Sequence, residues 1–127
     1  MSKSTKGLVW NRETRKLSEI EIKDYKDVQD ALFMEDYDSS ASDVTLTVAM
    51  CDMDGYRVTA YVDDCGLLKS KPLSAVVGYP QPLAGNIVFV GDVDEEGNDS
   101  DVPKEAFEGA TKDGLPYVID LDGVIYG

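Results

Sequence analysis

The strongest secondary-structure signal in this chain is the stretch from Val44 to Val62, VTLTVAMCDMDGYRVTAYV. Its first part, Val44–Met50, alternates with the two-residue period of a half-buried strand. Asp52–Gly55 has the composition of a tight turn, and Tyr56–Val62 is rich in β-branched and aromatic residues. The sequence therefore predicts a β-hairpin, with one face of its first strand formed by Val44, Leu46 and Val48.

Further strands are predicted on both sides of this hairpin. Gly7–Trp10 and Lys16–Ile22 flank a turn at Asn11–Arg15 and indicate a second hairpin, in which Leu17 falls out of the alternating register. Asn86–Val90, NIVFV, is almost wholly apolar and is bounded by glycines at 85 and 91. This composition is typical of a central strand that is buried on both faces.

The remaining segments predict helices and connections. Asp24 can cap a short helix whose apolar face consists of Tyr25, Val28, Ala31 and Leu32. The proline-rich stretch 72–82 predicts an irregular connection, and Pro103–Glu108 one or two helical turns. We expect one α+β domain over residues 1–127, with a mostly antiparallel sheet of about five strands, one or two short helices and a flexible segment at 1–6.

The chain is strongly acidic, with 12 Lys/Arg, 25 Asp/Glu and a formal net charge of -13. Residues 1–26 contain seven Lys/Arg and four Asp/Glu, whereas residues 27–127 contain five and 21. The acidic body repels phosphates, which argues against direct nucleic-acid binding and favours basic proteins or cations as partners. Adaptation to a saline habitat would produce a similar surface, and composition leaves both explanations open.

Several kinds of chemistry lack their usual residues. Histidine is absent, which removes the commonest general base and metal ligand. Cys51 and Cys65 fit no metal-ligand spacing, and we expect two reduced thiols, with a disulfide as the geometric alternative. No apolar run reaches the ~18 residues of a membrane span, and residues 1–10 lack the apolar core of a signal peptide. We therefore expect a cytoplasmic protein without a cofactor or a membrane partner.

The stretch Tyr117–Tyr126, YVIDLDGVIY, resembles the first motif of haloacid-dehalogenase-type phosphatases. By that resemblance Asp120 would be the nucleophile and Asp122 the acid/base beside magnesium. The fold of those enzymes needs a parallel α/β domain after the motif, and only Gly127 follows here. We interpret DLDG as a turn between two short strands and expect no catalytic residues.

A second partial motif lies at Asp92–Gly97, DVDEEG, which resembles the start of a calcium-binding EF-hand loop. The twelfth position, normally a bidentate glutamate, is Pro103, so we expect no EF-hand site and at most weak cation binding. We interpret the segment as an exposed acidic loop. Its carboxylates form a candidate interaction surface: Asp92, Asp94, Glu95, Glu96, Asp99 and Asp101.

Two further groups of residues are candidate sites. Asp52–Asp54 and Asp63–Asp64 lie at the two ends of the returning hairpin strand, and we interpret them as turn residues rather than as a catalytic carboxylate pair. Tyr79, within GYPQP, is the candidate for an exposed aromatic contact. Core packing explains most of the other aromatic residues considered, which are Trp10, Tyr25, Tyr56, Tyr61 and Phe89.

A family resemblance rests on two stretches and on the order in which they occur: DDCGLLKSKPLSA at 63–75 and PLAGNIVFVGDVDEEGN at 82–98. With the preceding strand pair and helix, they resemble the small phage and plasmid proteins classed as domain of unknown function 3846. The resemblance covers about residues 7–102 and leaves 103–127 as an extension. Ser74 stands where that family has asparagine. The matching residues are Asp64, Gly66, Leu67, Leu68, Pro72 and Leu73, then Gly85, Val88, Val90, Gly91, Asp94 and Gly97.

The resemblance implies a viral or mobile-element accessory protein, and it supplies no catalytic residues. We therefore expect a non-enzymatic protein that binds a basic surface of a host protein, in competition with nucleic acid if that surface normally holds phosphates. The alternative is a module for a small ligand or a nucleotide signal, with a pocket near Tyr79. An anionic ligand would require Arg57, Lys69 and Lys71 to converge.

Overall fold

The structure is a computed structural model, and it describes residues 5–14, 16–35, 39–53, 56–66, 68–69, 71, 73–76, 82–91, 101–102 and 118–120. Its main element is an antiparallel five-stranded sheet with the strand order β2-β1-β7-β4-β3. The strands are β1 (Thr5–Asn11), β2 (Lys16–Ile22), β3 (Leu46–Met53), β4 (Tyr56–Asp63) and β7 (Ile87–Gly91). With helix α1 (Tyr25–Leu32) and the 3-10 turn η1 (Ala41–Asp43), this confirms the predicted α+β fold.

Strand β7 joins the two predicted hairpins into one sheet. It pairs with β1 through Val9 and Val88, and with β4 through Thr59 and Val90. All of Ile87–Val90 is buried, as its apolar composition predicts. The side chains of β7 alternate between the two faces of the sheet, so both faces are covered.

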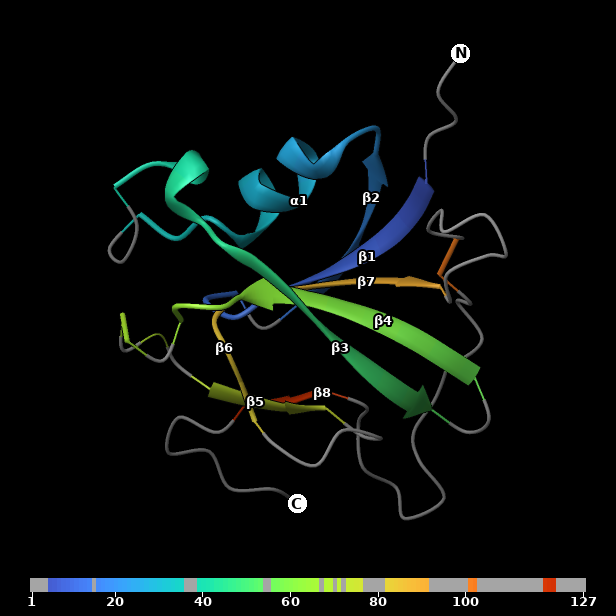
Figure 1. Cartoon of the computed structure of the whole chain (residues 1–127). Coiled ribbons are helices and arrows are strands. Elements are labelled where there is room, and N and C mark those ends of the chain that lie inside the picture. The colour runs from blue at the N-terminus through green and yellow to red at the C-terminus, as the bar shows by residue number, and fades with distance from the viewer. Residues whose placement is uncertain are drawn as a thin grey trace.

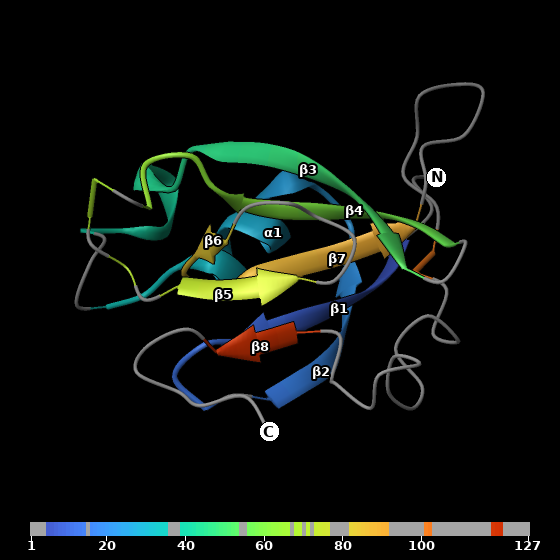
Figure 2. The same ribbon diagram turned by 90° about the horizontal axis from the view of Figure 1, so that it is seen from below.

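Three layers are visible in Figure 1: α1 lies on one face of the five-stranded sheet, and a smaller sheet lies on the other. The smaller sheet has the order β6-β5-β8, formed by β5 (Leu73–Val76), β6 (Leu83–Ala84) and β8 (Val118–Asp120). Figure 2 shows it from its outer side, with β5 and β8 in front of the main sheet. This second sheet is not among the elements predicted from the sequence.

The core has one cluster on each face of the main sheet. The helix-side cluster consists of Ile22, Val28, Leu32, Val44, Val88 and Val90. The cluster between the two sheets contains Leu8, Trp10, Ala49, Cys51, Val58, Ala60, Val62, Val76, Leu83, Ile87, Phe89 and Val102. Trp10 also donates an indole hydrogen bond to Ser74 Oγ at 3.0 Å, which ties the two sheets together.

The structure corrects three predictions. The irregular connection at 72–82 contains β5, because residues 73–76 pair with the nearby strand β6 and with β8, which lies far along the chain. Thr5 and Lys6, placed in a flexible end, belong to β1. Tyr25 was placed on the apolar face of the helix, and it is 63% exposed. The predicted grouping of Val44, Leu46 and Val48 on one face holds, but Val48 is 53% exposed, whereas Val44 is buried.

Candidate interaction surface

Most of the acidic loop proposed as an interaction surface lies outside the described residues: Asp92, Asp94, Glu95, Glu96 and Asp99, as does Tyr79. Asp101 is described and exposed. Its Oδ1 accepts a hydrogen bond from the Lys6 backbone N–H at 2.8 Å, and the Val102 N–H donates to the Lys6 carbonyl at 2.9 Å. Since Val102 is buried in the core, residues 101–102 hold one end of the acidic loop against β1.

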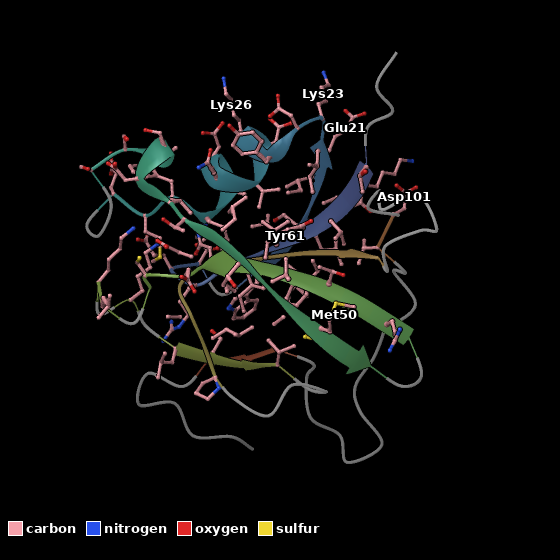
Figure 3. All side chains as sticks on the ribbon, viewed as in Figure 1. Glu21, Lys23, Lys26, Met50, Tyr61 and Asp101 are labelled. Carbon is pink, nitrogen blue, oxygen red and sulfur yellow. The ribbon has the colours of Figure 1, made fainter. Side chains whose placement is uncertain are left out.

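A second acidic surface lies over α1 and η1, which contact each other. We call it the α1 acidic surface and define it by the carboxylates of Asp24, Asp27, Asp30, Glu35 and Asp43. Asp27 is half-buried and the other four residues are exposed. Residues 24–43 contain seven Asp/Glu and one Lys. In Figure 3, Lys26 projects from this surface, and Asp101 lies on the opposite side of the view from η1.

Local hydrogen bonds fix the N-terminal end of this surface. Asp24 is the N-cap of α1 and accepts from the Lys26 N–H at 2.8 Å. Asp27 completes a capping box by accepting from the backbone N–H groups of Lys23 and Asp24. These backbone hydrogen bonds, from Lys23 first, lower the pKa of Asp27 below its ordinary value. Asp27 is therefore ionised at neutral pH.

The other end of the surface is organised by serines. The Asp43 carboxylate accepts hydrogen bonds from the Ser39 and Ser40 hydroxyls. These bonds, the Ser39 bond most, lower the pKa of Asp43. Asp43 therefore also carries its negative charge at neutral pH.

This surface is not among the sites predicted from the sequence, although the sequence contains a signal for it. Asp24, Asp27 and Asp30 are spaced by three residues, which places them on neighbouring positions of one helical side. The predicted apolar face of the same segment is confirmed, since Val28 and Leu32 are buried. Both patterns follow the helical period, and they occupy different, adjoining sides of α1.

Asp63 is not only a turn residue but the centre of a buried ion-pair cluster. Its Oδ1 accepts from the Cys65 N–H at 3.0 Å, which is the turn role that was predicted. Its Oδ2 accepts from Lys69 Nζ at 2.7 Å and Lys71 Nζ at 2.9 Å. Burial alone would raise the pKa of Asp63, but the hydrogen bonds from Lys69 and Lys71 outweigh it and lower the pKa to about 2.

This cluster contradicts the requirement set for an anionic ligand site. Arg57 lies near the start of β4, whereas Lys69 and Lys71 bind Asp63 at its end. At ~3.3 Å per strand residue, Arg57 and Asp63 are ~20 Å apart. The three cations therefore do not converge.

A hollow of about 240 Å³ lies between the β1–β2 turn, the end of α1 and Asn86, and it is lined by Asn11, Glu13, Phe33, Met34, Glu35 and Asn86. The Asn86 side chain connects its walls by accepting from the Arg12 N–H at 2.8 Å and donating to the Ala31 carbonyl at 3.0 Å. The charged groups in its lining are carboxylates, which favours a cationic over an anionic occupant.

The remaining candidate residues that the structure describes are not assembled into a reactive group. Cys51 and Cys65 are free thiols, and burial raises the pKa of the Cys51 thiol to about 11, which makes it unreactive. Asp120 ends β8, which pairs antiparallel with β5, and Asp122 lies outside the described residues. Over the described ranges, Cys, Asp and Glu residues form no group of three or more that is suited to a metal ion. In the same ranges no helix has the length and hydrophobicity required to cross a membrane.

No family model, curated protein or solved structure matches this chain. The resemblance to the phage and plasmid family therefore stays a prediction, supported by the motif residues quoted above.

Proposed function

We propose that this protein acts without catalysis, by binding a basic surface of a partner protein through its carboxylates. The observation that carries the proposal is the α1 acidic surface, in which four exposed carboxylates and a half-buried one lie on α1, on the residues that flank it and on η1. Its fixed N-terminal end presents negative charge without the ordering cost of a flexible chain.

The acidic loop at 92–101 would add to this surface or act beside it. It contains six Asp/Glu and no Lys/Arg. Together with residues 24–43 it supplies 13 of the 25 acidic residues but one of the 12 basic residues. Such concentration of charge raises association rates with a basic partner and makes binding sensitive to salt.

The resemblance to a phage and plasmid family suggests where the partner would be found. A small acidic protein encoded by a mobile element would meet host proteins, and those that bind nucleic acid have basic surfaces. Carboxylates placed where phosphates normally bind would compete with the nucleic acid for that surface. We therefore propose a host nucleic-acid-binding protein as the partner class.

The test is capture of binding proteins from host lysate on the immobilised protein at about 50 and about 300 mM NaCl. Asp30→Lys with Glu35→Lys reverses two charges of the α1 acidic surface, and Glu95→Lys with Glu96→Lys reverses two in the loop. The control, Glu19→Lys with Asp64→Lys, reverses two exposed charges elsewhere and changes the net charge equally.

We expect a specific partner to be retained at low salt and by the control, and to be lost or weakened more than about tenfold by at least one test pair. The partner should also be released by added duplex DNA. A partner that binds equally at both salt concentrations and to all three variants would refute the proposal.

The small-ligand alternative has narrower support. The hollow beside Asn86 is large enough for a small molecule, but its charged lining is acidic. An anionic signalling nucleotide is therefore disfavoured in this hollow, and the ligand class that fits is a small amine or another organic cation. Native mass spectrometry of the purified protein would reveal such a ligand as an added mass that is lost in Glu13→Gln with Glu35→Gln.

A further inference from the structure

Strand β3 is one edge of the main sheet. In the described part of the chain it pairs with β4, and no strand lies on its other side. Figure 1 shows β3 crossing in front of β4, and Figure 2 shows it at the border of the sheet away from β2. Its eight residues leave a long row of backbone groups directed outward.

The hydrogen-bonding pattern identifies which backbone groups these are. The Asp64 N–H donates to the Thr45 carbonyl at 2.6 Å, so Thr45 directs its backbone groups toward β4. Because this direction alternates along an antiparallel strand, the N–H and C=O groups of Leu46, Val48, Met50 and Asp52 point to the open edge.

Apolar side chains accompany this open edge. Val48 is 53% exposed and Met50 is 46% exposed, and they lie two residues apart on the helix-side face. Met50 lies well away from α1 in Figure 3, so the helix does not cover it. Val48 and Met50 therefore form an apolar pair beside the unpaired backbone groups.

The opposite edge strand is protected against pairing and β3 is not. Strand β2 contains Lys16, Glu19 and Glu21, and charged residues of this kind oppose edge-to-edge association. Strand β3 has neither lysine nor proline, and its one charged residue is Asp52. The difference indicates that the β3 edge is available for a neighbouring strand.

We propose that β3 pairs with β3 of a second copy of this chain, antiparallel about a two-fold axis at Ala49. In this register Val48 lies opposite Met50 of the second copy, and Leu46 opposite Asp52. All four have outward-directed backbone groups, so their N–H and C=O groups can exchange hydrogen bonds. The sheet would then continue across the axis through both copies.

A second copy fits this edge because the edge complements itself. The two-fold axis brings the exposed valine of each copy against the exposed methionine of the other on the same face. It also keeps the two Asp52 residues at opposite ends of the strand pair. The remaining repulsion is between the net charges of the two copies, and salt screens it.

The test is sedimentation equilibrium of the full chain from about 1 to about 200 μM, at about 50 and about 300 mM NaCl. We expect a monomer–dimer equilibrium that is stronger at the higher salt, whereas binding to a basic partner weakens with salt. Amide exchange should show Val48 and Met50 becoming protected as the dimer forms, because their N–H groups are bonded only across the axis.

Val48→Pro removes an outward N–H without removing a bond to β4, and it should weaken dimerisation more than about tenfold. Val48→Lys keeps the backbone N–H and should also weaken dimerisation, because the lysines of the two copies would lie near each other across the paired edges. This variant tests the proposal even if the proline variant does not fold. Leu17→Lys on β2 is the matched control and should dimerise normally, since Leu17 is an exposed apolar residue of the other edge.

A monomer at all concentrations and both salts would overturn the proposal. A dimer that survives Val48→Lys, or one that Leu17→Lys abolishes, would overturn it as well. Dimerisation does not depend on the carboxylates of the proposed partner site, so each proposal can fail while the other holds.

Discussion

Asp63 Oδ2 accepts a hydrogen bond from Lys71 Nζ at 2.9 Å, and both side chains are almost completely removed from solvent. Lys69 donates to the same oxygen at 2.7 Å and also to the Asp43 carbonyl. The cluster therefore connects the end of β4 with the segment that leads into β5 and with η1. It secures the junction between the main sheet and the small sheet.

Lys71→Met should destabilise the protein by about 3 kcal/mol, because it removes the buried partner of a buried carboxylate. Because Lys69 still pairs with Asp63 in this variant, the loss of stability is smaller than for a buried carboxylate without any partner. Lys69→Met should cost about 1 kcal/mol or less, since Lys69 is partly exposed. Urea unfolding of both variants measures the free energy of unfolding. Equal stability of Lys71→Met and wild type would contradict this role.

The same cluster predicts an acid limit to stability. The pKa of Asp63 is lowered to about 2 in the folded protein. In the unfolded chain it is about 3.9, so the contribution of about 2.5 kcal/mol is complete above pH ~4 and is lost as the pH falls to ~2. Urea unfolding between these values should show wild type approaching Asp63→Asn in stability. A constant difference between the two proteins would refute this assignment.

Ser74→Ala should destabilise the protein by about 1–2 kcal/mol, because it leaves the buried Trp10 indole N–H without its acceptor. Trp10 is the chain's one tryptophan, so its fluorescence follows the change directly. We expect unfolding monitored by this fluorescence to shift to lower urea. Ser18→Ala, at an exposed position of β2, is the control and should leave the transition unchanged.

Gly85→Ala should destabilise the protein by about 1–2 kcal/mol or more. Gly85 has a φ of 80°, and an added Cβ would approach Lys71 Cδ to 2.7 Å. The substitution therefore strains the backbone and presses on the buried ion pair. Thermal unfolding measures the effect, and a melting temperature equal to that of wild type would show that the turn is not constrained.

Elements with a strong local pattern were predictable. The alternation in 44–62 and the apolar run at 86–90 identified β3, β4 and β7, and Asp24 marked the start of α1. Strand β5 was not predictable in this way, because prolines surround it and its pairing partners lie at 83–84 and 118–120. A short strand formed by distant pairing leaves little periodic signal in its own residues.

The candidate surfaces show the same division. The carboxylates of 92–101 were evident from composition, and the α1 acidic surface could have been found from the spacing of Asp24, Asp27 and Asp30. The exposure of Val48 could not have been predicted from the sequence. A strand residue that a helix covers and one that the helix leaves exposed have the same alternating pattern. Which of these applies depends on where α1 ends on the sheet.

The acidity, the hairpins, the central strand and the capped helix follow from the amino-acid sequence alone, because each depends on residue type and on spacing within a few turns or one strand pair. The tertiary structure places β7 between β1 and β4 and, over the described residues, makes β3 an edge of the sheet. It also decided that Asp63 is buried with Lys69 and Lys71 instead of remaining a solvated turn residue. These outcomes depend on contacts between distant segments, and a charge is buried only where the fold supplies its partners.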